Sequence, residues 1–294
     1  MSIIKKTFKL LSGTEMPLVG IGTYKIRGDE VIERVLDESL EVGFRSIDTA
    51  VVYQNENSIG LALKKLLPKY NLKREDLFIT TKLAPNVSGD PEKIRESVHN
   101  SLKFLNTTYL DLCLIHWPGK GRLIENSPEN ASARVVTWDT LVELKRKGLI
   151  KSIGVSNFTI KHLEHLKQHS SVVPDVNQVE CHPHYRQDEL IEYCKKEGIL
   201  LQAYSSLGTS DPNDHTKLLG SSVVQKIATK LNVSPARLLL RWALQRGLAI
   251  IPKAVKTEHI QDNIKLDFEI SEEDMKELSS LPQEKYAWNP DNVA

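Results

Sequence analysis

Short apolar runs alternate with amphipathic segments along almost the whole of this 294-residue chain. Eight runs read as strands, and sequence with the apolar spacing of a helix follows each one. They are Leu18–Gly22, Phe44–Ile47, Leu77–Leu83, Leu110–His116, Ser152–Val155, Val176–Glu180, Leu200–Tyr204 and Leu248–Ile251. Alternating strand–helix units call for a parallel sheet covered by helices. Eight units in about 250 residues favour a closed (β/α)8 TIM barrel over an open doubly wound sheet.

The segments between the strands predict the rest of the architecture. Two runs, Thr7–Leu11 and Met16–Val19, flank a turn that contains glycine, which predicts a small N-terminal β-hairpin. Because no low-complexity linker interrupts the chain, we expect one domain over residues 1–294. The polar segment Gly119–Ala133 predicts a long loop after the fourth strand. Helices are expected over Asp29–Val42, Glu56–Leu67, Pro91–Leu105, Val136–Lys147, Ile160–His169, Asp188–Glu197, Ser222–Leu231 and Pro235–Arg246, with a last one starting at His259–Asn263.

Composition excludes several classes of protein. The 39 basic and 38 acidic residues leave a formal charge of +1, which does not indicate a nucleic-acid-binding or membrane-binding surface. No apolar run approaches the ~20 residues that span a bilayer, and the N-terminus lacks the apolar core of a signal peptide. Cys113, Cys181 and Cys194 are odd in number and lack metal-type spacing. We therefore expect reduced thiols, no metal and a cytoplasmic protein.

Polar residues stand where three of the predicted strands end. Asp48, Lys82 and His116 close the second, third and fourth strands, and Tyr53 follows Asp48 by five residues. Taken singly, they read as a helix cap, an ion-paired lysine, a core histidine and a packing tyrosine. The carboxyl ends of barrel strands face one pocket, so their common position predicts one shared site.

This combination of groups suits proton donation to a carbonyl oxygen. A nearby ammonium stabilises tyrosinate, so Lys82, held and kept charged by Asp48, is expected to lower the pKa of Tyr53. His116 can donate a hydrogen bond that orients the carbonyl. None of these side chains can supply a hydride, so a cofactor must, and nicotinamide is the usual source.

Five longer motifs resemble those of the aldo-keto reductase family, in the same order. They are residues 43–56 (GFRSIDTAVVYQNE), 80–83 (TTKL), 110–118 (LDLCLIHWP), 150–158 (IKSIGVSNF) and 177–183 (NQVECHP). The resemblance runs nearly from end to end of the chain. It implies NADPH-dependent reduction of aldehydes and ketones on a TIM barrel. Tyr53 would be the proton donor, Lys82 and Asp48 would tune it, and His116 would orient the substrate.

The resemblance also implies a cofactor site. Residues matching Ser156, Asn157 and Gln178 bind the nicotinamide carboxamide in the family, and the residue matching Tyr204 stacks on the ring. Independently of the family, TIM barrels often bind phosphate with the loops after strands seven and eight, here Ser205–Lys217 and Lys253–Asn263. The full set expected to contact the cofactor is Gly22, Thr23, Asp48, Ser156, Asn157, Gln178, Tyr204, Ser205, Leu207, Lys253, Ala254, Lys256, His259 and Asn263.

The chain departs from the family pattern at several positions. Ala254 stands where serine is usual, and His259 replaces an arginine that would offer phosphate a permanently charged fork. NADPH is still the expected cofactor, with NADH as the alternative. Ala84 stands where many relatives place a tryptophan, and the tail is short, so we expect an open pocket. The expected substrate contacts are Tyr24, Tyr53, His116 and Trp117, and Trp288 is either a further wall or a core anchor.

Two other functions fit parts of the pattern. One is a non-catalytic cofactor-binding sensor or regulatory subunit on the same fold. The other is an unrelated barrel lyase in which Lys82 forms a Schiff base, although the pairing of Asp48 with Tyr53 argues against it. For a reductase, the sequence leaves open which small carbonyl compound is the substrate. It also does not decide between a monomer and a weak homodimer.

Overall fold

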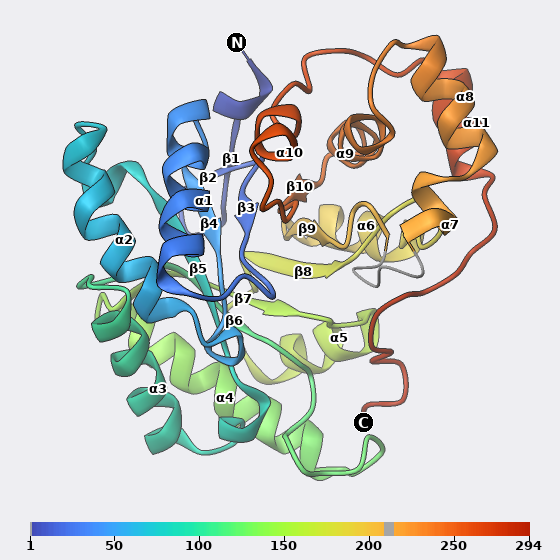
Figure 1. Ribbon diagram of the computed structural model, residues 1–294. Coiled ribbons are helices and arrows are strands. Elements are labelled where there is room, and N and C mark those ends of the chain that lie inside the picture. Colours follow the sequence, from blue (N-terminus) through green and yellow to red (C-terminus); the bar gives the residue numbers. More distant parts are fainter. Residues whose placement is uncertain (1, 209–214) are drawn as a thin grey trace.

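The computed structural model describes residues 2–208 and 215–294, and its centre is an eight-stranded parallel sheet (Figure 1). The strands follow one another around the sheet in chain order: β3 (Ile21–Gly22), β4 (Ser46–Asp48), β5 (Phe78–Leu83), β6 (Leu110–Ile115), β7 (Ile150–Ser156), β8 (Val176–Glu180), β9 (Leu200–Tyr204) and β10 (Ala249–Ile250). A parallel bridge joins Val19 to Ile250. At this seam the Gly20 amide donates to the Ile250 carbonyl at 2.9 Å. The sheet therefore closes on itself, which confirms the predicted (β/α)8 barrel.

Helices surround the barrel. They are α1 (Asp29–Val42), α2 (Glu56–Lys69), α3 (Pro91–Phe104), α4 (Glu129–Arg146), α5 (Ile160–His169), α6 (Asp188–Glu197), α7 (His215–Leu219), α8 (Ser222–Lys230), α9 (Pro235–Gln245), α10 (Thr257–Asp262) and α11 (Glu272–Ser279). Short 3-10 turns lie at η1 (Ile3–Lys5), η2 (Val51–Tyr53), η3 (Arg74–Asp76) and η4 (Pro85–Val87). None of the helices in the described ranges is long and apolar enough to cross a membrane.

The predicted N-terminal hairpin is present and closes the end of the barrel at which the strands begin. Its strands, β1 (Thr7–Lys9) and β2 (Glu15–Pro17), pair antiparallel. Leu10 and Met16 are buried in an apolar cluster apart from the larger one that the helices cover. The strand residues of this smaller cluster are Phe78, Leu112, Leu114, Val176, Leu200 and Ala249. Because side chains alternate along a strand, these residues belong to the inner face. The hairpin therefore covers an apolar layer inside the barrel, at the amino ends of its strands.

The inner face becomes polar toward the carboxyl ends of the strands. Counting in steps of two from Phe78 leads to Lys82, and counting from Val176 leads to Gln178 and Glu180. All three of these polar residues are buried. The two-residue periodicity thus places an apolar layer below and a polar layer above, which is where a barrel carries its site.

One expectation about the chain needs correction, and one open alternative is decided. Helix α4 begins at Glu129, so the segment expected as a loop over Gly119–Ala133 ends at Pro128. The start of this helix is polar because Asn130, 1% exposed, accepts a hydrogen bond from the Lys120 amide at 2.9 Å and caps the loop. Trp288 is not a core anchor, since 62% of it is exposed. Helices α7 and α11 were not predicted.

Candidate active site

The structure brings three of the four candidate catalytic residues into direct contact. Lys82 lies in β5, Asp48 ends β4, and Tyr53 ends the turn η2. The Lys82 Nζ donates to both Asp48 carboxylate oxygens, at 2.7 and 2.8 Å. It lies 3.4 Å from the Tyr53 hydroxyl and donates to the Thr49 carbonyl at 2.9 Å. A buried ion pair therefore stands directly behind the tyrosine hydroxyl.

Aromatic rings flank that hydroxyl. The His116 ring meets the Tyr53 ring nearly edge-on, with 5.8 Å between centroids and an interplanar angle of 76°. On another side, the Tyr24 ring centroid lies 5.1 Å from that of Tyr53. Tyr24, Tyr53, His116 and Trp117 are all half-buried, whereas Ala84 is buried. The expected substrate-contacting residues thus include three that surround one point at the rim of the barrel.

The tyrosine is a neutral phenol in this environment. Burial raises the pKa of Tyr53 well above its ordinary value. The negative charge of Asp48 raises this pKa further, and the neighbouring Tyr24 adds a smaller contribution in the same direction. This is opposite to the lowered pKa expected from the sequence. The reason is that the Lys82 charge is compensated by Asp48, while burial disfavours tyrosinate. Burial also lowers the pKa of the Lys82 ammonium, and the Asp48 carboxylate counteracts that effect.

The candidate histidine is also neutral. Burial lowers the pKa of His116 to about 3, and the Lys82 ammonium contributes. Its Nδ1 is buried and has no hydrogen-bond partner among the residues that the structure describes. A neutral imidazole carries one N–H, so His116 can donate one hydrogen bond to an oxygen atom of a ligand.

A second group of polar side chains continues from this site along β7, β8 and β9. The Gln178 Nε2 donates to Asp48 Oδ2 at 2.8 Å and to Gln202 Oε1 at 2.7 Å. The Asn157 Nδ2 donates to the His116 carbonyl at 3.0 Å, and the Tyr204 hydroxyl donates to Asn157 Oδ1 at 2.7 Å. We call Ser156, Asn157, Gln178 and Tyr204 the cofactor wall. Its amides and hydroxyls match a carboxamide in kind, and its half-buried tyrosine offers a flat ring.

The remaining expected cofactor residues lie near the seam of the barrel. A Cβ on Gly22 would come within 2.7 Å of the Ile251 carbonyl oxygen and 3.8 Å of the Lys253 amide, so only glycine fits there. Thr23 is fully buried and its Oγ1 donates to the Asp48 carbonyl at 2.8 Å. The β3 end is thereby fixed between Asp48 and the loop that carries Lys253.

The loop residues differ in exposure. Lys253, Lys256 and His259 are exposed, whereas Ala254 and Asn263 are buried. Ser205 has a left-handed backbone (φ 50°), and Leu207 is half-buried. Residues 209–214 of the predicted phosphate-binding loop Ser205–Lys217 lie outside the described residues. The three exposed basic side chains could reach an anion, whereas Ala254 lacks a polar group.

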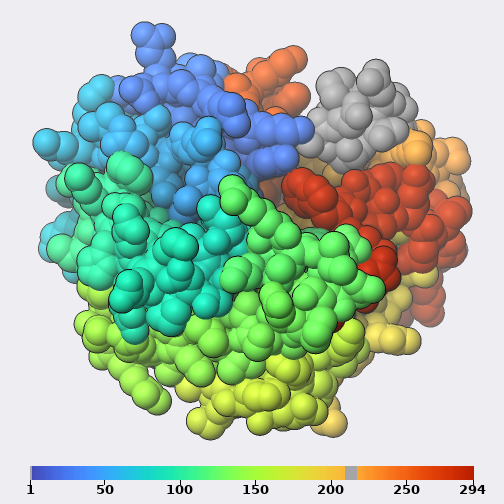
Figure 2. Space-filling model, turned by 90° about the horizontal axis from the view of Figure 1, so that it is seen from below, coloured from blue at the N-terminus to red at the C-terminus, as the bar shows by residue number. Residues whose placement is uncertain are grey.

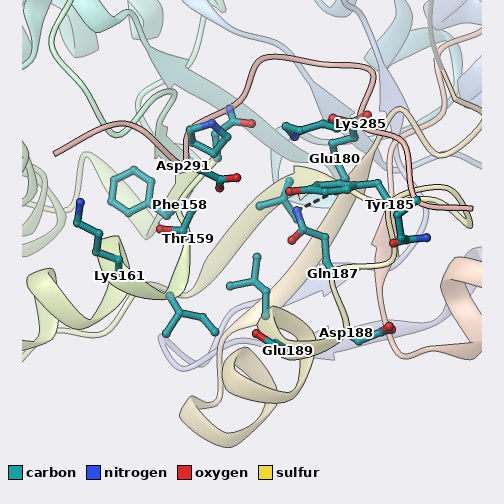
Figure 3. Close-up of a pocket in the computed structure, with 16 residues that line it drawn as sticks. Phe158, Thr159, Lys161, Glu180, Tyr185, Gln187, Asp188, Glu189, Lys285 and Asp291 are labelled. Carbon is teal, nitrogen blue, oxygen red and sulfur yellow. Dashed lines mark hydrogen bonds and ion pairs between the residues drawn. The ribbon is translucent and has the colours of Figure 1, made fainter. Parts of the chain in front are cut away.

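A cavity lies beside the cofactor wall (Figure 3). Its volume is about 510 Å³, and its lining comes from the starts of α5 and α6 and from the C-terminal segment. Asn157 lines it, but Asp48, Tyr53, Lys82 and His116 do not. The cavity therefore lies behind the cofactor wall and not at the candidate catalytic residues.

Sequence reasoning missed Gln202, which belongs to this site, and Glu180, which stands beside it. Gln202 accepts the hydrogen bond from Gln178, and Glu180, 1% exposed, follows Gln178 by two positions on the same face of β8. The available signal was the two-residue alternation, which puts both on the inner face. Within the described ranges, no group of three or more histidine, cysteine or acidic side chains could hold a metal ion.

Comparison with known proteins identifies relatives over the whole barrel. The sequence model of the Aldo/keto reductase family matches residues 18–282. Glyoxal reductase of Bacillus subtilis (strain 168) is 41% identical over 293 residues, which cover 99% of this chain and 98% of that protein. Aldo-keto reductase family 1 member A1 of Sus scrofa is 41% identical over 288 residues, with coverage of 92% and 88%.

Solved structures agree with these sequence matches. An aldo-keto reductase from a Medee basin deep-sea metagenome library superposes with a TM-score of 0.87 at 36% identity, covering 98% of this chain and 99% of that one. The aldose reductase of Schistosoma japonicum gives a TM-score of 0.84, also at 36% identity, with coverage of 95% and 93%. The chain therefore matches aldo-keto reductases both in sequence and in fold, over nearly its whole length.

Proposed function

We propose that this chain, which belongs to the aldo/keto reductase family and reduces carbonyl compounds to alcohols, takes its hydride from NADPH and its proton from Tyr53. The observation that carries the proposal is the buried Lys82–Asp48 pair, whose ammonium lies 3.4 Å from the Tyr53 hydroxyl. When bound, the nicotinamide supplies a hydride to the carbonyl carbon.

Tyr53 provides the proton that the carbonyl oxygen takes up when the carbon accepts the hydride. Its raised pKa keeps the hydroxyl protonated before reaction. As negative charge develops on the substrate oxygen, the Tyr53 hydroxyl donates its proton there. The phenolate that remains faces the Lys82 ammonium at 3.4 Å, and Asp48 holds that ammonium in place from the other side. The ion pair therefore favours the charge distribution that follows proton transfer.

His116 orients the substrate. With a pKa of about 3 the imidazole is neutral at physiological pH, so its one N–H donates to the carbonyl oxygen without transferring a proton. Its ring stands nearly perpendicular to that of Tyr53, and Asn157 holds its backbone carbonyl. This proximity of the two rings supports the proposal that both side chains donate to the same substrate oxygen.

The cofactor wall would hold the carboxamide and the ring of the nicotinamide. Lys253 and Lys256 would contact the phosphates, and the exposed His259 would contribute less than an arginine at this position. We therefore expect NADPH to be used, with a weaker preference over NADH than an arginine would give. For the substrate, we propose small aldehydes, including dicarbonyls such as the glyoxal after which the Bacillus subtilis relative is named.

The direct test is the oxidation of NADPH, followed by its absorbance, with glyoxal, an aromatic aldehyde and an aldose, and in parallel with NADH. We expect turnover that depends on both carbonyl and cofactor, and faster turnover of glyoxal than of the aldose. A protein that binds NADPH tightly but oxidises it with none of these compounds would contradict the proposal and support a cofactor-binding sensor instead.

A further inference from the structure

A buried carboxylate at the rim of the barrel holds the last segment of the chain. Glu180 ends β8, and it pairs with Tyr204 of β9 in the sheet register. We call residues 281–294 the C-terminal strap. Three donors of the strap converge on Glu180: the Lys285 Nζ at 2.8 Å, the Tyr286 amide at 2.6 Å and the Ala287 amide at 3.0 Å. One side chain of the barrel thus fixes three consecutive residues of the strap.

This carboxylate is charged in the folded protein. Burial alone would raise the pKa of Glu180, but the contact with His182 and the Lys285 ammonium lowers it to about 2. The His182 Nε2 lies 3.0 Å from Glu180 Oε1. The Lys285 Nζ also lies 4.3 Å from the centroid of the Tyr185 ring. Figure 3 shows Glu180 and Lys285 together at the edge of the cavity. Hydrogen bonds to an ionised acceptor are about twice as strong as neutral ones.

The strap also contacts the loops that follow β8 and β9, next to the cofactor wall. The Tyr286 hydroxyl lies 2.5 Å from His184 Nδ1, and its ring centroid is 5.0 Å from that of His182. A Cβ placed on Gly208, in the loop after β9, would lie 3.5 Å from the Tyr286 ring, so the two segments are in contact. The Glu284 carboxylate accepts from Lys217 at 2.8 Å. The strap therefore connects the loop after β8 to both described flanks of the loop after β9.

A separate anchor holds the far end of the strap. The Arg134 guanidinium donates to the Ala294 carbonyl at 2.8 Å, and His162 Nε2 lies 2.9 Å from the Val293 carbonyl. Figure 2 shows this red segment lying against the green surface of the loop before α4, where the Ala294 amide donates to the Glu125 carbonyl at 2.9 Å. Between the two anchors, Pro290 and Asp291 line the cavity behind the cofactor wall. Loss of the Glu180 anchor would remove the three hydrogen bonds that hold Lys285, Tyr286 and Ala287, and would leave the strap held by its contacts with the loop after β8, by Lys217 and by its far end.

We propose that Glu180 is a positioning residue that fixes the C-terminal strap against the loops that follow β8 and β9, beside the cofactor wall, and so slows release of the cofactor. The inference rests on the proposed use of NADPH. Glu180 shares the inner face of β8 with Gln178 and neighbours Tyr204 across the sheet, while the strap that it holds packs on Gly208. A loosened strap would lose its contact with Gly208, which lies in the loop that follows Tyr204, so the bound cofactor would escape faster. Hydride transfer, which depends on Tyr53 and Lys82, would not change.

The experiment compares the wild-type protein with Glu180→Gln, which keeps the size of the side chain and removes its charge. Hydrogen exchange of the protein without cofactor reports the strap directly, and a stopped-flow chase of bound NADPH reports its release. We expect faster exchange at Tyr286 and Ala287 and release faster by about tenfold, within the range of typical coupling between sites. The single-turnover rate with saturating aldehyde should match wild type. Glu277→Gln, which removes a carboxylate from an exposed pair with Lys226, is the matched control and should change none of these quantities.

Several outcomes would overturn the inference. Faster exchange with an unchanged release rate would show that the strap does not govern the cofactor. Unchanged exchange in folded Glu180→Gln would show that Glu180 is not the anchor. If that variant fails to fold, Lys285→Met removes one donor from a partly exposed lysine and should shift exchange and release in the same direction to a smaller extent. A wild-type protein that binds no NADPH would refute the proposed function itself, and this inference with it.

Discussion

Replacing Lys82 with methionine should destabilise the protein strongly, because it leaves a buried carboxylate without its counterion. Lys82 is fully buried, and the Asp48 side chain is only 3% exposed. Without Lys82, Asp48 keeps the side-chain hydrogen bond that the Gln178 Nε2 donates to it at 2.8 Å. Breaking a buried pair from one side costs about 3–5 kcal/mol. At roughly 2–4 °C per kcal/mol for a large domain, the thermal midpoint should fall by about 10 °C.

Thermal unfolding followed by circular dichroism, at fixed protein concentration and scan rate, measures this loss. The double variant Asp48→Asn/Lys82→Met removes both charges and should lose less than the two single losses added together. Lys65→Met is the control, because its pair with Glu33 is exposed and such pairs contribute about 0–1 kcal/mol. A Lys82→Met midpoint no lower than that of Lys65→Met, or strict additivity in the double variant, would refute this reasoning.

Two further predictions concern histidines. The pKa of His116 is lowered to about 3 and that of His162 to about 4, both chiefly by burial. The unfolded chain therefore binds more protons than the folded chain below the ordinary value of about 6.5, so the thermal midpoint should fall as the pH drops from 7 toward 4; a midpoint that stays constant over this range would contradict the lowered values. Separately, His259→Arg should increase the preference for NADPH over NADH by about tenfold or more, since one charge-assisted contact with phosphate contributes about 1.5–3 kcal/mol. Dissociation constants of both cofactors test this, and an unchanged ratio would show that His259 does not face the 2′-phosphate.

Periodicity predicted most of the fold because the buried residues of most strands and helices are apolar and recur at the spacing typical of each element. The bounds of α1, α5 and α6 and of the strands β8 and β9 agree with the sequence-based ranges. The start of α4 could not be found in this way, since its buried residues Asn130 and Arg134 are polar and donate hydrogen bonds to loop carbonyls. Local polarity suggested a loop where tertiary hydrogen bonds stabilise a helix.

The candidate site was partly predictable for a similar reason. Strand ends gave Asp48, Lys82 and His116, because parallel strands of a barrel end at one rim. The direction of the Tyr53 pKa was wrong, since sequence shows which charges are near but not how far burial outweighs them. Glu180 was missed because its partners lie 105 to 107 residues away in the strap, and the local sequence does not predict a contact over that separation.

The claim that Tyr53 donates the proton is tested most directly by Tyr53→Phe. This variant keeps the ring that packs on Tyr24 and His116 and removes only the hydroxyl beside Lys82. The measurement is kcat for an aldehyde with NADPH, together with the dissociation constant of NADPH. General acid catalysis contributes roughly 10²–10⁴-fold, so kcat should fall by at least that order while cofactor affinity is retained. A variant that retains most of its turnover would show that another group donates the proton.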